Sequence, residues 1–130
     1  MNQPLAILAV ALGGAAGSVA RYLVNLAFVA RLGSGFPWAT FTINVTGSFL
    51  IGVVMQIAAS RLGMSPYVRV LLATGVLGGF TTFSSFSFEA LTLGSGGAIM
   101  ASVLYVVGSV VLGVLAAFGG VVVVRLLVAP

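Results

Sequence analysis

Four long apolar stretches, separated by short turn-forming segments, make up almost the whole chain. They cover residues 4–30, 36–60, 67–93 and 98–125, and each exceeds the roughly 20 apolar residues that a helix needs to cross a bilayer. Of the 130 residues, 61% are hydrophobic and 5% are charged, which is too little charge to cover a water-facing surface. The pattern predicts an all-α integral membrane protein with four transmembrane helices.

The segments between these stretches, residues 31–35, 60–66 and 94–97, are rich in turn formers. Helices joined by such short links must run antiparallel to their neighbours. No linker and no internal repeat marks a second domain, so we expect residues 1–130 to form a single four-helix transmembrane domain. Because no basic residue precedes the apolar run of residues 5–20, we expect a retained first helix and not a signal peptide.

The polar composition excludes several classes of function. Five arginines and one acid, Glu89, give a net charge of +4 without a basic cluster, so the chain lacks the basic patch of a nucleic-acid-binding protein. It has no cysteine and no histidine, which removes thiol chemistry, the usual zinc sites and imidazole catalysis. The lone acid has no lysine or other base as a catalytic partner. We therefore expect that the protein is not an enzyme.

The third stretch contains a run that is unlike the rest of the chain, residues 78–89, which reads Gly-Gly-Phe-Thr-Thr-Phe-Ser-Ser-Phe-Ser-Phe-Glu. A pair of glycines in the membrane core can break a helix, and the freed backbone groups then need partners from protein, water or an ion. We therefore expect the third helix to be broken near Gly78–Thr82.

Three of the four phenylalanines of this run recur at every third position. Phe80, Phe83 and Phe86 are predicted to lie along one helical face. Hydroxyl groups are expected on a neighbouring face, from Thr81, Ser84 and Ser85. Aromatic edges carry partial positive charge and hydroxyls donate protons, so this run suits a small dehydrated anion.

Polar side chains also recur at helical spacing in the second and fourth stretches. Thr40, Asn44 and Ser48 form a stripe on the second, and such a stripe faces protein or water. Asn44 either makes interhelical hydrogen bonds or lines a pathway. Tyr105 and Ser109 lie one turn apart on the fourth stretch and could pack normally or form a wall of that pathway.

The first stretch combines small residues with a basic one. Gly13 and Gly17 are four residues apart, which favours close packing of two helices. Arg21 follows one turn later on the same face. An arginine at this depth snorkels to the interface, is paired or faces a water-filled cavity, and the sequence leaves both snorkelling and an electropositive vestibule open.

Three of these motifs resemble those of the Fluc-type (CrcB) bacterial fluoride channels. The run from Gly78 to Glu89 resembles the family's core motif, residues 13–22 its first-helix signature and residues 40–52 its second. Two positions depart from the pattern. Ser85 stands where the family more often has threonine, and Ala39 stands where glycine commonly occurs. The first keeps a hydroxyl group and the second keeps a small side chain.

The resemblance implies a fluoride-selective channel that passively exports fluoride from the cytoplasm and confers fluoride resistance. It implies a multi-pass protein of the bacterial inner (plasma) membrane that forms an antiparallel, dual-topology homodimer with two pores. It also implies a central structural sodium ion held by the backbone carbonyls of Gly78 and Thr81. Arg21 and Glu89 are implied to line the vestibule. The implied pore and fluoride positions are Phe83, Phe86, Asn44, Ser84, Ser85, Tyr105, Ser109 and Thr40.

Two other functions remain as alternatives. A small four-helix proton-coupled multidrug exporter has a similar length, but such exporters carry a membrane-embedded glutamate in the first helix. Here the first stretch has no acid and carries Arg21, while Glu89 lies in the third stretch. A small scaffold or assembly subunit would fit the glycines but would leave the phenylalanine and hydroxyl run unexplained.

Overall fold

A computed structural model describes residues 1–60 and 62–128. This part of the chain is helical and contains no strand. Its elements in order are α1 (Gln3–Leu32), α2 (Trp38–Ala59), α3 (Pro66–Arg69), the π-helical segment η1 (Val70–Leu77), α4 (Gly78–Phe80), α5 (Phe83–Ser95) and α6 (Ile99–Val128).

The four predicted membrane spans are confirmed. The helical spans Gln3–Leu32, Trp38–Ala59, Pro66–Ser95 and Ile99–Val128 are each long and apolar enough to cross a membrane. The second was expected to begin at residue 36, but α2 begins at Trp38 because Pro37 has a non-helical ψ of 56°. Gly33, with a φ of 73°, adopts a backbone conformation that favours glycine and ends α1.

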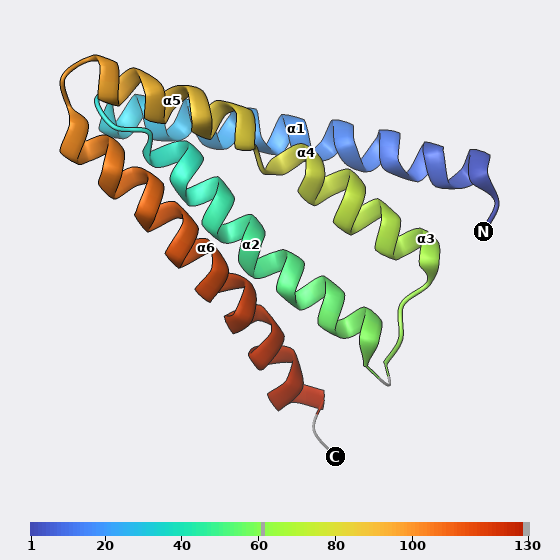
Figure 1. The fold of residues 1–130 in the computed structure, drawn as a ribbon. Coiled ribbons are helices and arrows are strands. Elements are labelled where there is room, and N and C mark those ends of the chain that lie inside the picture. Colours follow the sequence, from blue (N-terminus) through green and yellow to red (C-terminus); the bar gives the residue numbers. More distant parts are fainter. Residues whose placement is uncertain (61, 129–130) are drawn as a thin grey trace.

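The spans form two helix pairs that diverge from one end of the molecule. Figure 1 shows α2 against α6 and α1 along the first half of the third span, and the contacts of η1 and α4 with α1 agree. After the break, α5 instead packs on α6. The third span therefore belongs to one pair in its first half and to the other in its second half. The start of α1 and the end of α6 lie at the open end, where the pairs are far apart (Figure 1).

Glycines bring α1 and the third span into close contact, as the small residues of the first stretch predict. A Cβ atom added at Gly13 would lie 2.5 Å from the carbonyl oxygen of Leu71. One added at Gly17 would clash with the carbonyl oxygen of Val76. Both positions therefore require the absence of a side chain, because backbone atoms cannot move aside cheaply.

The break in the third span is confirmed near Gly78–Thr82, but its cause is not the paired glycines. Gly78 is helical, with φ −65° and ψ −36°, and Gly79 also lies within α4. The chain leaves the helix at Thr81, with ψ 159°, and Thr82 is extended, with φ −153° and ψ 117°. Gly79 serves packing, since a Cβ there would lie 2.5 Å from the carbonyl oxygen of Gly14.

The expectation that three phenylalanine rings share one helical face is wrong for Phe80. This residue ends α4, and two extended residues separate it from α5, so the helical period does not carry across. Its ring lies near Gly47 of α2 instead. Phe83 and Phe86 do lie together on α5, with ring centroids 5.6 Å apart.

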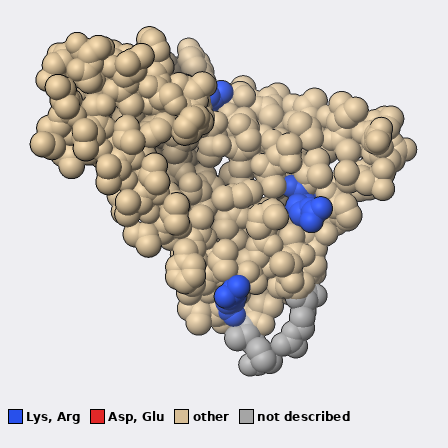
Figure 2. All heavy atoms as spheres, viewed as in Figure 1, with Lys and Arg blue, Asp and Glu red and all other residues tan. Residues whose placement is uncertain are grey.

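The surface is dominated by uncharged groups, as expected of a protein surrounded by lipid. Figure 2 shows isolated basic side chains on one face, without a basic cluster. Large apolar side chains are exposed on both α1 and α6. The most deeply buried large side chains are Tyr105 and Ile43, at 1% and 2% exposed. The Tyr105 ring packs against Phe86 of α5.

The glycine contacts give a first prediction. Gly17→Ala should lower the free energy of unfolding by about 1–3 kcal/mol, the usual cost of overpacking, because its Cβ meets the Val76 carbonyl. Gly14→Ala is the matched control, since a Cβ there would meet no atom within 4 Å. Thermal unfolding in detergent, followed by circular dichroism, compares the two. Equal midpoints for both variants would contradict the packing described here.

Candidate functional site

Asn44 binds the extended backbone at the break of the third span. Its side-chain nitrogen donates to the carbonyl oxygen of Thr82 at 3.0 Å, and its side-chain oxygen accepts from the Thr82 N–H at 2.9 Å. The amide therefore pairs with both polar backbone groups of an extended residue, as a neighbouring β-strand would. We call this pair of hydrogen bonds the clamp at Asn44. Of the two roles considered for Asn44, the interhelical hydrogen bond is present. The second N–H of the amide still leaves a donor for a ligand.

Thr82 begins the helix after the break. Its hydroxyl accepts from the backbone N–H of Ser85 at 3.3 Å and donates to the Ser85 hydroxyl at 3.1 Å. The Ser84 hydroxyl lies 3.4 Å from the same oxygen. Thr82 was not among the site residues expected from the sequence, yet it joins the hydrogen bonds on both sides of the break. Threonine is a preferred residue at the position just before a helix, and this was the signal that could have identified it.

Backbone carbonyls lose their helical partners at the break, and those of Gly78 and Thr81 are among them. In an unbroken helix, Gly78 would accept from the N–H of Thr82 and Thr81 from the N–H of Ser85. Those donors are bound instead by Asn44 and by the Thr82 hydroxyl. The Thr81 side chain is also engaged, donating to the carbonyl of Leu77 at 2.8 Å. The Gly78 and Thr81 carbonyls thus fit a hard cation such as sodium, which prefers oxygen ligands.

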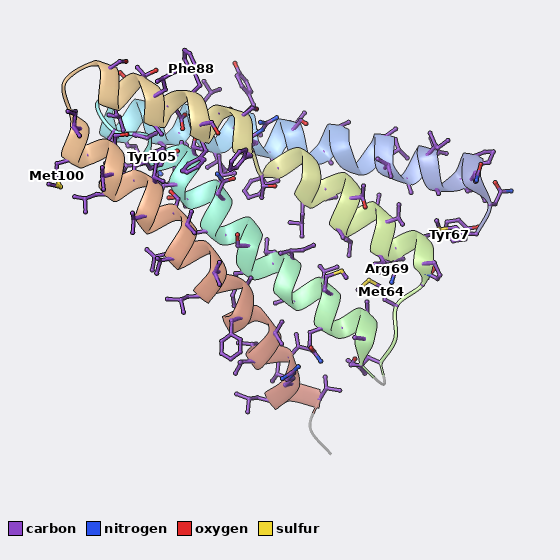
Figure 3. All side chains as sticks on the ribbon, viewed as in Figure 1. Met64, Tyr67, Arg69, Phe88, Met100 and Tyr105 are labelled. Atoms are coloured by element: carbon purple, nitrogen blue, oxygen red, sulfur yellow. The ribbon has the colours of Figure 1, made fainter. Side chains whose placement is uncertain are left out.

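Glu89 joins three helices through its carboxylate. Thr40 of α2 donates to one oxygen at 2.8 Å, and Tyr105 of α6 donates to the other at 2.7 Å. Thr40 is 5% exposed and Tyr105 is 1% exposed, so both hydroxyls are fixed by packing. Figure 3 shows Tyr105 in the region where α6, α2 and α5 meet. In this structure the two hydroxyl protons are donated to Glu89 and not to a cavity.

Aromatic rings form a wall beside the break. Phe86 is 8% exposed, and its ring centroid lies 5.1 Å from that of Tyr105. Phe83, one turn earlier, is 79% exposed. The sequence predicted both rings on one wall. The structure adds that the Phe86 ring is buried against Tyr105 of α6, whereas the Phe83 ring is exposed on the surface.

Two cavities flank the break. The first has a volume of about 360 Å³ and is bordered by the polar or aromatic residues Asn44, Ser48, Phe83, Phe86 and Ser109 and by Gly78 and Thr81. The second, of about 260 Å³, is bordered by Arg21, Thr40, Ser85 and Glu89. Thr82 borders both. The sequence did not show that two separate groups of residues lie on opposite sides of Thr82.

Most of the site residues expected from the sequence thus gather in one of the two cavities. Ser84 and Tyr105 border neither. Within the described chain, the Ser109 hydroxyl is the one buried side-chain polar atom without a hydrogen-bond partner. Buried polar groups are rarely left unpaired, so a hydroxyl beside the first cavity is available to a ligand. Arg21 borders the second cavity, as expected if it lines an electropositive vestibule.

A comparison with known families decides the classification. A family model described as CrcB-like protein, Camphor Resistance (CrcB), matches residues 8–121. The chain belongs to the CrcB family. The match includes the glycines of α1, the clamp at Asn44 and the whole broken span.

Individual relatives are similar over nearly the full length of the chain. A fluoride-specific ion channel FluC of Rhizobium meliloti (strain 1021) is 51% identical over 122 residues, which cover 94% of this chain and 98% of the relative. One of Chlorobium luteolum is 48% identical, covering 94% of each chain. One of Thermus thermophilus is 50% identical over 113 residues, covering 87% of this chain and 88% of the relative.

As a CrcB family member with four membrane-crossing helices, the chain is a multi-pass bacterial membrane protein and not an enzyme. These matches do not favour a proton-coupled multidrug exporter.

The clamp gives a second prediction. Asn44→Asp should destabilise the fold, because a carboxylate keeps the acceptor for the Thr82 N–H but loses the donor to the Thr82 carbonyl. Leaving a buried backbone group unpaired costs on the order of 1–3 kcal/mol. Ser48→Ala, one turn away beside the same cavity, is the matched control. Thermal unfolding in detergent should separate the two variants, and an Asp variant as stable as the control would contradict the clamp.

Proposed function

We propose that this chain is a fluoride-selective channel that passively exports fluoride from the bacterial cytoplasm and so confers fluoride resistance. The observation that carries the proposal is the first cavity, which is bordered by Phe83, Phe86 and Ser109, a residue whose hydroxyl has no hydrogen-bond partner. The relatives that are about half identical to this chain bear the name fluoride-specific ion channel, which supports the choice of ion.

The chemistry of this cavity suits a small, strongly hydrated anion. A channel must replace the water that the ion loses, and it does so with hydrogen-bond donors and partial positive charges. Ser109 offers a hydroxyl, Asn44 offers its second N–H, and the edges of Phe83 and Phe86 carry partial positive charge. Aliphatic residues at these positions would offer the ion nothing in exchange for its hydration.

The second cavity supplies the entrance. Arg21 borders it and raises the local concentration of anions at the mouth of a pathway. Ser85 borders it as well, and its hydroxyl oxygen accepts from Thr82 and keeps its own proton for a ligand. Thr40 borders this cavity and becomes a donor to fluoride once Glu89 releases its hydroxyl group. Tyr105 donates to the same carboxylate, so Glu89 controls both hydroxyl groups.

The functional unit is an antiparallel homodimer with two pores. Gly78 and Phe83 are both exposed in the single chain, and irregular backbone at membrane depth is tolerated only where protein or water covers it. A second copy placed against the break would cover it. A central structural sodium ion coordinated by the carbonyls of Gly78 and Thr81 would give the freed oxygens a partner and would join the two chains.

Dual topology follows from the weak charge asymmetry of the chain. Apart from Arg21, the side with the termini and the second turn carries Arg61, Arg69 and Arg125, and the other side carries Arg31. Basic residues near helix ends set orientation, and this small difference leaves both orientations accessible. A cysteine added at the C-terminus should be labelled from both sides of the membrane in cells. Strictly one-sided labelling would refute mixed insertion.

Ion efflux from liposomes tests the proposed function. Purified protein in liposomes loaded with fluoride should release the ion when an ionophore balances the charge. Chloride-loaded liposomes with the same protein are the control and should retain their ion. Release of chloride without release of fluoride would overturn the assignment.

The same assay examines the aromatic wall. Phe83→Ile and Phe86→Ile should spare folding, since swaps of similar bulk typically cost under about 1.5 kcal/mol, yet should reduce fluoride efflux sharply because an aliphatic side chain lacks the positive edge. Matched gel-filtration profiles exclude loss of assembly as the cause. If both variants assemble and conduct at the parent rate, the aromatic edges do not act on the ion.

A further inference from the structure

A third cavity, of about 240 Å³, lies where the turn between α1 and α2 meets α5. Its walls come from the end of α1, the turn, the start of α2 and the outer face of α5. Four aromatic residues border it, namely Phe28, Phe36, Trp38 and Phe88, and Glu89 supplies the only carboxylate side chain of the protein. Figure 3 shows Phe88 projecting from α5 on the side away from α6.

Part of this aromatic wall is fixed and part of it is open. Phe36 lies 4.6 Å from Trp38 and 5.5 Å from Tyr105, as measured between ring centroids, and it meets Tyr105 edge to face. Trp38 is nevertheless 46% exposed and Phe88 is 70% exposed. The wall therefore combines a rigid base with exposed ring surface that a ligand could cover.

The carboxylate beside these rings has no ionic partner among the described residues. It accepts hydrogen bonds from the hydroxyls of Thr40 and Tyr105, which carry no charge. Arg21 and Glu89 both border the second cavity. Arg21 nevertheless forms no ion pair with the Glu89 carboxylate, whose partners are hydroxyl groups. An acidic group in a membrane protein is costly unless it is paired or hydrated. A cation in the third cavity would supply that pairing.

We propose that the third cavity binds a small organic cation, a quaternary or protonated amine, with Glu89 as its counter-charge and the aromatic rings as its walls. Aromatic cages recognise such cations through the negative faces of the rings. An anion would be repelled by the carboxylate, and the described residues around Glu89 include no second carboxylate to hold a hard divalent metal ion. The amine could belong to a dissolved molecule or to a lipid headgroup, because the cavity lies beside a turn at the end of the spans.

Intrinsic fluorescence tests the proposal directly. Trp38 is the only tryptophan of the chain and borders the cavity, so its emission reports on occupancy. The protein in detergent is titrated with benzyltrimethylammonium and, separately, with its uncharged isostere neopentylbenzene. A saturable change with the cation alone is the expected result. The same response to the uncharged molecule would overturn the proposal, since the cavity would then only absorb apolar compounds.

Variants separate the charge from the rings. Glu89→Gln should weaken binding of the cation at least about tenfold, and Phe88→Leu by about two- to fivefold. Phe118→Leu is the matched control, because this ring is also exposed, at 63%, but borders none of the three cavities. Should Glu89→Gln fail to assemble, the comparison of Phe88→Leu with Phe118→Leu decides the matter. Equal affinities in that comparison, or an unchanged affinity in Glu89→Gln, would overturn the proposal.

Lipid nanodiscs identify the source of the amine. The titration is repeated in discs of phosphatidylglycerol alone and in discs that also contain phosphatidylethanolamine. Weaker apparent binding of the probe in the second discs assigns the site to the lipid headgroup, and equal binding assigns it to dissolved amines. None of these measurements involves fluoride flux, so failure of this inference would leave the proposed function standing.

Discussion

Within a bilayer every backbone N–H and C=O needs a partner inside the protein, and the exchange of two hydrogen bonds between Asn44 and Thr82 is how this chain meets that requirement at its break. Without that pairing both polar backbone groups of Thr82 would lack a protein partner. The redirected α5 is what brings Phe86 against Tyr105 and Glu89 within reach of Thr40. The freed carbonyls and the two flanking cavities are consequences of the same interaction.

Most of the residues that were singled out for their chemistry border one of the two cavities beside the break. The sequence predicted the spans well, because apolar length alone determines them. It failed where position depends on partners. Nothing local shows that Gly78 and Gly79 remain helical, or that Gly79 serves to let α1 approach. The turn out of the helix depends on Asn44, which is 38 positions away from Thr82. For the same reason Phe80 could not be separated from Phe83 by periodicity.

Glu89 illustrates how one residue can serve several surroundings. A lone acid in an apolar chain is hard to interpret, because the sequence does not reveal its neighbours. In the structure it ties α5 to α2 and α6 and borders both the second and the third cavity. Any change in the charge of Glu89 therefore alters the hydrogen bonds that the hydroxyls of Thr40 and Tyr105 donate to it. This places the carboxylate between the proposed anion route and the proposed cation site.

Thr82 borders both the first and the second cavity, so the two cavities share part of their wall. On the proposed function, an ion that leaves the ligands of one cavity is already beside those of the other, without an intervening stretch of bare apolar wall. Two anions in cavities that share a wall would also repel each other strongly, because the surroundings screen charge poorly. An anion that enters one cavity would therefore speed the departure of an anion from the other. The rate of transport would rise with the concentration of anions at the entrance.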